Sequence, residues 1–369
     1  MTENKRIDST RLAKSTPDDL QTILATTDNN LNRLRAWLAA TLGTTLSAAN
    51  YRIETAFDGM NDSKYFRITI GHETRIVIDA HTGAGATLGN YHRFQPVSAL
   101  FRAAGVATPT VLIEDAASRY LIVTDLGAQT YLHAFNETNA DLLLGDARHA
   151  LIKWQLASKP NVLPACDAAH LRRELNQFSD AYIAQHLGVT LTAPQQQALA
   201  HIFSIIVEAN VAQANVYVHR DYVPKNLLVS TPNPAVLGFE RAMFGSISYD
   251  IASLYKDVDI SWDEERVLDG TIRYWEAAKK ANLPVPHDFG DFYRDVEWMG
   301  LQRHLSMMGQ AANSAEGSGQ TLQHLAQMPR LVRYIRKVGE RYVALFPLIR
   351  LFDKLNISDG IKRTVGVSF

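Results

Sequence analysis

This sequence has a single cysteine, no excess of either charge and no long apolar run. One cysteine, Cys166, excludes an intramolecular disulfide and a metal site built from a cysteine cluster, so a reduced, cytoplasmic setting is expected. The 37 basic and 38 acidic residues give a formal charge of −1, which offers no bulk attraction to nucleic acid or to an anionic membrane. No run of about 18 apolar residues exists, so no membrane span is expected. The polar start of the chain lacks the apolar core of a signal peptide.

Two parts of the chain show different patterns. Residues 19–125 have the period of two helices, at 28–42 and 94–104, and of strands at 51–57, 64–70, 75–79, 110–114 and 120–124. Residues 126–369 are mostly helical, with helices expected at 140–158, 167–187, 194–212, 262–281, 288–310 and 320–354, the last broken by Pro347. Because 46% of the residues are hydrophobic, the 369-residue chain can bury a large core. We therefore expect two lobes that meet near Asp125, preceded by a mobile tail at 1–18.

One loop carries the residues with the clearest chemistry. His219, Arg220 and Asp221 stand together, and Asn226 follows five residues after Asp221. Short apolar, β-prone segments flank this loop, at 216–218, 227–229 and 235–237. A carboxylate at the mouth of a loop can accept the proton of an acceptor hydroxyl during phosphoryl transfer, which predicts Asp221 as the catalytic base. An amide oxygen suits Mg²⁺, which predicts Asn226 as a metal ligand. The Asp-to-Asn spacing is that of a kinase catalytic loop, and the alternative is a solvated Arg-Asp pair.

Candidate nucleotide contacts lie in the first part of the chain. The polar loop at 58–63 could cover phosphates with its N–H groups, which makes Asn61, Ser63 and the adjoining Lys64 candidates; an ordinary β-turn is the alternative. An adenine could bond to the backbone around Asp125, since peptide groups supply both a donor and an acceptor. A cleft between two lobes is a common place for such a ligand. The strand at 75–79 has no lysine where the kinase pattern Val-Ala-Ile-Lys places one.

Several short motifs spread over nearly the whole chain belong to one pattern, at residues 64–67, 77–80, 124–127, 130–132, 219–222, 249–254 and 299–305. In these motifs the sequence resembles the aminoglycoside phosphotransferase-like superfamily. Within it, the sequence is similar to the bacterial cell-wall recycling kinases that phosphorylate N-acetylmuramate and N-acetylglucosamine at the anomeric hydroxyl. Members of that group likewise carry Asp-Ala, and no lysine, at the positions of Asp79 and Ala80.

The resemblance implies an α+β, two-lobed, protein-kinase-like fold, with an N-terminal antiparallel sheet plus helices and a mainly helical C-terminal lobe. It also implies ATP and Mg²⁺ as cofactors and a small sugar as acceptor, with no nucleic-acid or membrane partner. Asp221 would match the catalytic base of the family and Asn226 a metal ligand. Asp250 matches a position that supports the catalytic loop, and we assign the same structural role to His219.

The sequence departs from this family at the metal site. The family has Asp-Phe-x-Asp after the second short strand, where the first Asp is the main Mg²⁺ ligand, but this chain has Gly238 at that position and Arg241 at the last one. Val223 also replaces a histidine that is common in the loop of the family. If residues 236–240 are extended, Glu240 faces the same side as Gly238 and could hold a shifted Mg²⁺; an ion pair with Arg241 is the alternative. The departures leave two hypotheses open, a sugar kinase and a catalytically silent binding protein that keeps the cleft.

A polar cluster in a later helix supplies the candidate acceptor contacts. Gln302, Arg303 and His304 interrupt an otherwise amphipathic pattern. The guanidinium fork of Arg303 suits the carboxylate or acetamido group of an amino sugar, so Arg303 and Gln302 are candidate substrate-binding residues. Solvation at the surface is the alternative.

Overall fold

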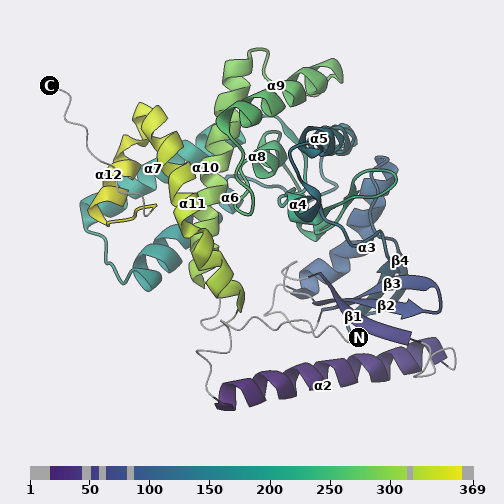
Figure 1. Cartoon of the computed structure of the whole chain (residues 1–369). Helices are drawn as coiled ribbons and strands as arrows, with labels where there is room; N and C mark the ends of the chain where they lie inside the picture. The colour runs from purple at the N-terminus through teal and green to yellow at the C-terminus, as the bar shows by residue number, and fades with distance from the viewer. Residues whose placement is uncertain (1–16, 44–50, 58–63, 81–86, 314–318, 360–369) are drawn as a thin grey trace.

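The computed structural model describes residues 17–43, 51–57, 64–80, 87–313 and 319–359. Figure 1 shows a smaller lobe, in which helices lie against a β-sheet, and a larger helical lobe. This is the two-lobed α+β arrangement that the sequence predicts. Most of the expected tail at 1–18 and the expected phosphate loop at 58–63, with Asn61 and Ser63, lie outside the described residues.

The sheet of the smaller lobe is antiparallel and has the strand order β1-β2-β3-β5-β4. Its strands are β1 (Tyr51–Phe57), β2 (Lys64–Ile70), β3 (Glu73–Asp79), β4 (Val111–Asp115) and β5 (Tyr120–Thr124). Gly71 turns the chain between β2 and β3 at a φ of 62°, which glycine adopts with little strain. β5 lies between β3 and β4 and leads directly into Asp125, so the sheet delivers the chain to the junction of the lobes.

One helix covers each face of this sheet. Alternate residues of a strand point to opposite faces, so Val77 packs with α2 (Pro17–Leu42), whereas Ile76 and Ile78 pack with α3 (Thr87–Ala103). On the α2 side, Trp37 stacks on Tyr120 with ring centroids 4.5 Å apart. Both faces of the sheet are therefore packed against a helix.

The larger lobe consists mainly of helices. Their bounds are α4 (Tyr131–Ala134), α5 (Ala140–Leu156), α6 (Ala168–Gln177), a π-helix (Phe178–His186), α7 (Ala193–Val211), α8 (Tyr249–Tyr255), α9 (Glu264–Lys280), α10 (Phe289–Asn313), α11 (Gly319–Arg341) and α12 (Phe346–Lys354). Short strands lie among them: β6 (Asn215–Val218) pairs with β9 (Met243–Ser246), and β7 (Leu227–Leu228) pairs with β8 (Ala235–Val236). α10 is buried along most of its length, which makes it the central helix of this lobe.

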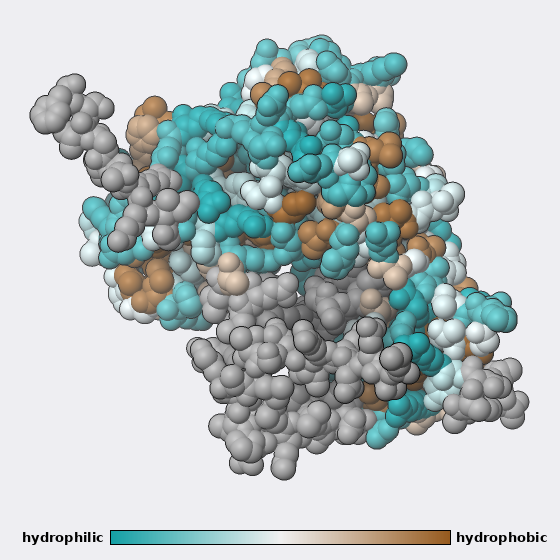
Figure 2. All heavy atoms as spheres, in the orientation of Figure 1, coloured by the Kyte–Doolittle hydropathy of each residue, from teal (hydrophilic) through white to brown (hydrophobic). Residues whose placement is uncertain are grey.

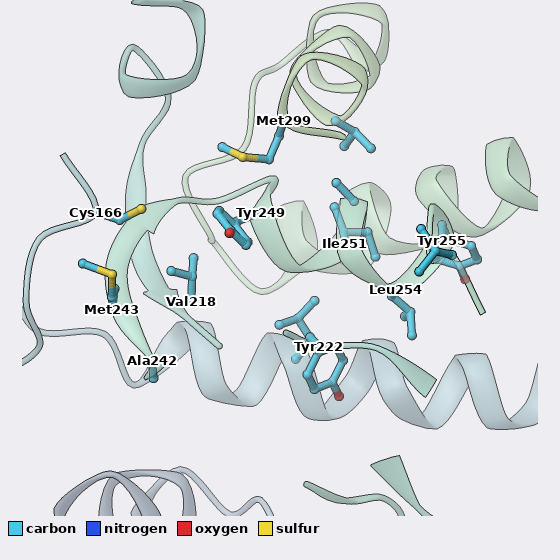
Figure 3. Close-up of a cluster of buried hydrophobic side chains, with 14 of the residues drawn as sticks. Cys166, Val218, Tyr222, Ala242, Met243, Tyr249, Ile251, Leu254, Tyr255 and Met299 are labelled. Carbon is cyan, nitrogen blue, oxygen red and sulfur yellow. The ribbon is translucent and has the colours of Figure 1, made fainter. Parts of the chain in front are cut away.

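A buried cluster joins β6, β9, α8 and α10 (Figure 3). Val218, Met243, Ile251 and Met299 are each at most 6% exposed. Burying side chains of this size stabilises the fold by about 1.5–3 kcal/mol each. Cys166 belongs to the same cluster, and burial raises the pKa of its thiol to about 12, so it remains a protonated core residue. The candidate catalytic loop therefore begins at a strand, β6, that is held in the core.

Several boundaries differ from those that the sequence predicts. The helix expected at 28–42 begins at Pro17, and the helix expected at 167–187 divides into α6 and the π-helix. The break expected at Pro347 comes earlier, since α11 ends at Arg341 and α12 begins at Phe346. Proline suits the first turn of a helix because it has no N–H to donate, so Pro347 starts α12. α8 and β9 are not predicted at all.

In the coloured part of Figure 2, polar residues cover much of the surface, with apolar residues scattered among them. Within the described parts of the chain, no helix is both long and apolar enough to span a membrane.

Candidate active site

The candidate catalytic loop leaves the end of β6 and is held by His219. This side chain is fully buried and lies between two backbone groups: its Nε2 donates to the carbonyl oxygen of Leu237 at 2.9 Å, and its Nδ1 accepts from the N–H of Asp221 at 3.2 Å. Burial lowers the pKa of His219 to about 4, so the ring is neutral near pH 7, and its two hydrogen bonds assign the proton to Nε2. His219 thus ties the loop to the strand that precedes Gly238.

Asp250, in the first turn of α8, holds the same loop from the other side. Its buried carboxylate accepts hydrogen bonds from the N–H groups of His219 at 2.6 Å and Arg220 at 2.9 Å. Arg220 has a φ of 75°, a left-handed conformation that costs a residue with a side chain about 1–2 kcal/mol. The two hydrogen bonds that Asp250 accepts, with the ion pair between Arg220 and Glu174, offset that strain. His219 and Asp250 therefore both hold the backbone of the catalytic loop, which is the structural role predicted for them.

Asp221 presents a carboxylate that remains partly open to solvent. Its side chain is 38% exposed, and its Oδ2 accepts from Nδ2 of Asn226 at 2.8 Å. The same Nδ2 also donates to the backbone oxygen of Asp221 at 2.8 Å, which fixes the loop between the two residues. Burial opposes ionisation here, but the positive charges of Lys225 and Arg303 outweigh it and lower the pKa of Asp221. The carboxylate is therefore ionised near pH 7 and able to accept a proton.

Gly238 lies directly beside Asn226, but the chain around it is not extended. Gly238 has φ 72° and ψ 22°, and residues 239–241 form a turn of 3₁₀ helix. The expectation that alternation places Glu240 on the side of Gly238 is therefore wrong, because a left-handed residue followed by a helical turn ends the two-residue period. A Cβ atom on Gly238 would lie 3.1 Å from Nδ2 and 3.3 Å from Oδ1 of Asn226. Position 238 therefore lies next to Asn226, the predicted metal ligand. This agrees with the resemblance, which has the main Mg²⁺ ligand of the family at position 238.

Glu240 is buried behind this turn, at 5% exposure. Burial raises the pKa of its carboxyl, and the positive charges of Arg241 and Arg93 act in the opposite direction. Arg93 comes from α3 and donates to the carbonyl oxygen of Ala242, so the helix over the sheet contacts the turn that carries Glu240. The carboxyl of Glu240 therefore lies among cationic groups from both lobes.

A pocket between the lobes ends at this turn. It is lined by Tyr65, Ile76, Ile78, Phe94, Pro109, Val123, Thr124, Asp125, Leu126, Leu228, Leu237, Gly238, Phe239 and Glu240. Its walls are mainly apolar and come from both lobes, and the backbone at 124–126 passes along one side. Gly238, at one end of this pocket, adjoins the side chain of Asn226.

Of the expected nucleotide contacts, the described residues include Lys64 and Asp125. Asp125 borders the pocket, but its carboxylate is bound by Arg67 at 2.6 Å and by the N–H of Gly127 at 3.0 Å, so only its backbone faces a ligand without competition. Arg67 also donates to the carbonyl oxygen of Gly127 at 2.9 Å, which makes it a link between β2 and the connection of the lobes. Lys64 has an exposed side chain at the start of β2 and stays a predicted phosphate contact.

The two residues expected to contact the acceptor, Arg303 and Gln302, lie in different surroundings. Arg303 lies 3.9 Å from Oδ1 of Asp221 and over the ring of Tyr249, with 6% of its side chain exposed. Gln302 is fully buried, and its Nε2 donates to the carbonyl oxygen of Leu171 at 2.9 Å in the packing of α10 on α6. Arg303 thus lies beside Asp221, whereas the Nε2 of Gln302 serves the packing of α10 on α6, so an acceptor contact by Gln302 stays a prediction.

Sequence reasoning missed three charged residues in the neighbourhood of Asp221, which are Lys225, Asp257 and Asp259. Lys225, inside the catalytic loop, lies 3.9 Å from Oδ2 of Asp259. Asp257 and Asp259 follow α8, and both act electrostatically on Lys225. The signal was present in the acidic alternation Asp-Val-Asp after α8, but nothing in the sequence shows that this segment reaches the loop.

Asn226 and Glu240 are the described residues that could contribute to a divalent-cation site. In the parts of the chain that the structure describes, no three His, Cys, Asp or Glu residues cluster to hold a metal. Since Nδ2 of Asn226 is directed to Asp221, its Oδ1 is the atom that remains for a cation, and Glu240 borders the same pocket as Gly238. Mg²⁺ keeps several water ligands and needs only one or two carboxylates besides substrate phosphates, so this incomplete set fits it.

Asp221 is linked through Asn226 to Gly238 at the end of the pocket between the two lobes, an arrangement typical of kinase-like phosphotransferases. Residues 53–286 match the model of the phosphotransferase enzyme family. An N-acetylmuramate/N-acetylglucosamine kinase of Pseudomonas aeruginosa is 39% identical over 292 residues, which cover 79% of this chain and 85% of that protein. A kinase of the same name from Neisseria meningitidis is 37% identical over 296 residues, covering 79% of this chain and 87% of that one. The chain therefore belongs to the phosphotransferase enzyme family, whose kinases act with ATP and a divalent cation.

The solved structure of the gentamicin complex of APH(2'')-IIa has the same fold, with a TM-score of 0.55 at 14% identity over 79% of this chain and 95% of that one. The kinase-like fold and the resemblance to sugar kinases are thus confirmed, and the chain is a kinase-type enzyme. These relatives do not favour the silent binding protein. The roles of individual residues stay predictions.

Proposed function

We propose that this protein is a cytoplasmic, ATP- and Mg²⁺-dependent kinase that phosphorylates an amino sugar, N-acetylmuramate or N-acetylglucosamine, at its anomeric hydroxyl during cell-wall recycling. The choice of sugar is supported by relatives of that name at 39% and 37% identity over 79% of the chain. Residues 19–125 would cover the nucleotide and residues 126–369 would carry the catalytic loop and the acceptor site.

The observation that carries this proposal is the setting of Asp221. Its carboxylate is partly exposed, ionised, and held by Asn226 next to the interlobe pocket. As the hydroxyl oxygen of the sugar bonds to the γ-phosphorus, its proton would move to Asp221, and the bond from phosphorus to the leaving ADP oxygen would break. A base at this position contributes through placement, because phosphoryl transfer depends on alignment and on neutralised charge.

Asn226 and Glu240 would hold the Mg²⁺, with water and phosphate oxygens completing its coordination. When bound, the cation supplies the positive charge that the phosphates need in the transition state. Asn61, Ser63 and Lys64 would contact the phosphates, and the backbone at Asp125 would bind the adenine.

Arg303 would bind the acceptor. Its guanidinium lies 3.9 Å from Asp221 and is held in place by the packing of α10, so a carboxylate or acetamido group bound there would leave a sugar hydroxyl close to the base. A guanidinium fork gives two parallel hydrogen bonds to a carboxylate, which favours N-acetylmuramate over a neutral sugar.

ATP-dependent phosphate transfer to both sugars, with Mg²⁺ and with Mn²⁺, tests the proposal, with Asp221→Asn as the inactive control. We expect transfer to at least one of the two sugars that depends on the cation and on Asp221. If the protein binds ATP but transfers phosphate to neither sugar with either cation, the proposed function is wrong.

A further inference from the structure

Arg303 is a buried cation that its ion pair with Asp221 does not hold in place. The residue is 6% exposed, and its Nη2 lies 3.9 Å from Oδ1 of Asp221. That separation is longer than a hydrogen bond, so the ion pair leaves the N–H groups of the guanidinium open to a ligand. An arginine side chain has several rotatable bonds and loses much freedom when it is fixed. Another group must therefore hold Arg303 beside the predicted base.

The ring of Tyr249 is the group over which Arg303 lies. Cζ of Arg303 is 5.7 Å from the centroid of this ring, within the distance of about 6 Å at which the face of an aromatic ring attracts a cation. Tyr249 is 4% exposed, so water screens this contact little. A cation–π contact is stronger when it is desolvated in this way. The contact is therefore well placed to fix the direction of the guanidinium.

Tyr249 is itself fixed with respect to both the catalytic loop and α10. Its ring belongs to the buried cluster of Figure 3, which also contains Met299. Met299 lies one turn before Arg303 on α10, so the two share the face of that helix that packs on α8. The residue after Tyr249, Asp250, accepts the two hydrogen bonds that hold the backbone of the catalytic loop. Tyr249 thus sets the position of Arg303 relative to this loop.

A second guanidinium approaches the same ring. Cζ of Arg220 is 6.0 Å from the centroid of Tyr249, but Arg220 also forms an ion pair with Glu174. Without the ring, Arg220 would keep this ion pair, whereas Arg303 would keep only its longer contact with Asp221. Loss of the ring should therefore release Arg303 more than Arg220.

We propose that Tyr249 is a positioning residue for the acceptor: its ring holds the guanidinium of Arg303 beside Asp221 and thereby sets the preference for an acidic sugar. This inference rests on the proposed function. A guanidinium that is already held loses less freedom when a carboxylate binds to it, which strengthens binding. A neutral sugar offers no carboxylate to Arg303, so it gains less from this arrangement.

A comparison of phenylalanine with pentafluorophenylalanine at position 249 tests the inference. Both rings have nearly the same shape, but fluorination removes the negative charge from the ring face that attracts a cation. We measure kcat and KM for N-acetylmuramate, N-acetylglucosamine and ATP, with Arg303 present and in Arg303→Ala. Tyr249→Leu removes the ring altogether. The matched control is Tyr255→Leu, which removes another buried ring from α8, one whose hydroxyl bonds to Arg148.

We expect Tyr249→Phe to behave like the parent, because the ring face remains. Pentafluorophenylalanine and Tyr249→Leu should lower the ratio of kcat/KM for N-acetylmuramate to that for N-acetylglucosamine by about 5- to 30-fold, the range for a buried cation–π contact. The change should lie mainly in KM for N-acetylmuramate, with KM for ATP unchanged. In Arg303→Ala the same replacements should leave the ratio unchanged, since Tyr249 acts through Arg303. Tyr255→Leu should lower Tm and leave the ratio unchanged.

If the fluorinated ring gives the same ratio as phenylalanine, or shifts it equally in Arg303→Ala, Tyr249 does not position Arg303, and the proposed function stands. A parent that phosphorylates N-acetylglucosamine alone would also overturn the inference, because no acidic sugar is then accepted. A parent that phosphorylates neither sugar would refute the proposed function itself. The two rings of nearly equal shape keep the test decisive even if Tyr249→Leu does not fold.

Discussion

Aspartate at position 238 would place a carboxylate against Asn226, where this chain has only a hydrogen atom. The change has two costs that the structure defines. Gly238 has a φ of 72°, so any other L-residue there costs about 1 kcal/mol of stability. The new Cβ would lie 3.1–3.3 Å from three atoms of the Asn226 side chain, so that side chain must move by a few tenths of an ångström.

The gain comes from charge. A carboxylate next to Oδ1 of Asn226 would complete the proposed cation site, for which this chain otherwise offers the amide oxygen and Glu240. Loss of an outer-shell partner already costs a metal site about 10- to 100-fold in affinity, so a direct ligand should raise Mg-ATP affinity at least about tenfold. Turnover should rise as well, because the cation neutralises charge in the transition state.

Gly238→Asn is the matched control, because it carries the same strain and the same steric contact without the charge. Mg-ATP affinity is measured by titration, and Tm is measured with and without Mg-ATP for both variants. Both should lose a few degrees of Tm in the absence of nucleotide. Only the aspartate variant should bind Mg-ATP more tightly than the parent. If it folds but binds Mg-ATP no better than the asparagine variant, the reasoning about the metal site fails.

Three other substitutions test the rest of the site. Asp221→Asn should lower kcat by about 10²- to 10⁴-fold and leave ATP binding nearly intact, measured by transfer kinetics and nucleotide titration. Arg303→Ala should weaken N-acetylmuramate more than N-acetylglucosamine by about 1.5–3 kcal/mol, measured as the ratio of the two kcat/KM values. His219 has a pKa of about 4 in the fold, below its ordinary value near 6.5, so the stability from its neutral form is complete above pH 6.5 and is lost as the pH falls to 4. This loss amounts to roughly 3 kcal/mol, and His219→Gln should remove it from a series of unfolding curves.

Each of these expectations has a contrary result. Near-normal turnover of Asp221→Asn would show that another group accepts the proton. Equal losses for both sugars in Arg303→Ala would place that guanidinium outside the carboxylate site. A stability profile between pH 6.5 and 4 that is equally steep in His219→Gln would assign the acid sensitivity to other groups.

Helices and strands could be predicted from the sequence where their repeat of apolar residues extends over enough positions. The strand at 64–70 and the helix at 140–158 each show a repeat that burial imposes, and the structure places β2 at the first and α5 within the second. α8 is short and buried on all sides, so it has no amphipathic repeat, and it was missed. β9 was missed as well, since Met243–Ser246 contains glycine and serine and has no β-branched residue to indicate a strand.

Only those contacts of the candidate site that follow from a short separation in the sequence could be predicted. Asp221 and Asn226 are separated by one short turn, so their contact follows from the motif. The conformation of Gly238 does not follow, because glycine is compatible with both an extended chain and a left-handed turn. Asp259 comes within 3.9 Å of Lys225 through the packing of α8 and α10, which no local pattern records.

Arg67 ties the sheet to the connection between the lobes, with bonds to Asp125 at 2.6 Å and to the carbonyl oxygen of Gly127 at 2.9 Å. A hinge secured in this way has fewer orientations to lose when a nucleotide arrives. Part of the entropy of orienting the two lobes is therefore lost during folding, so a ligand that binds between the lobes has less of it to overcome.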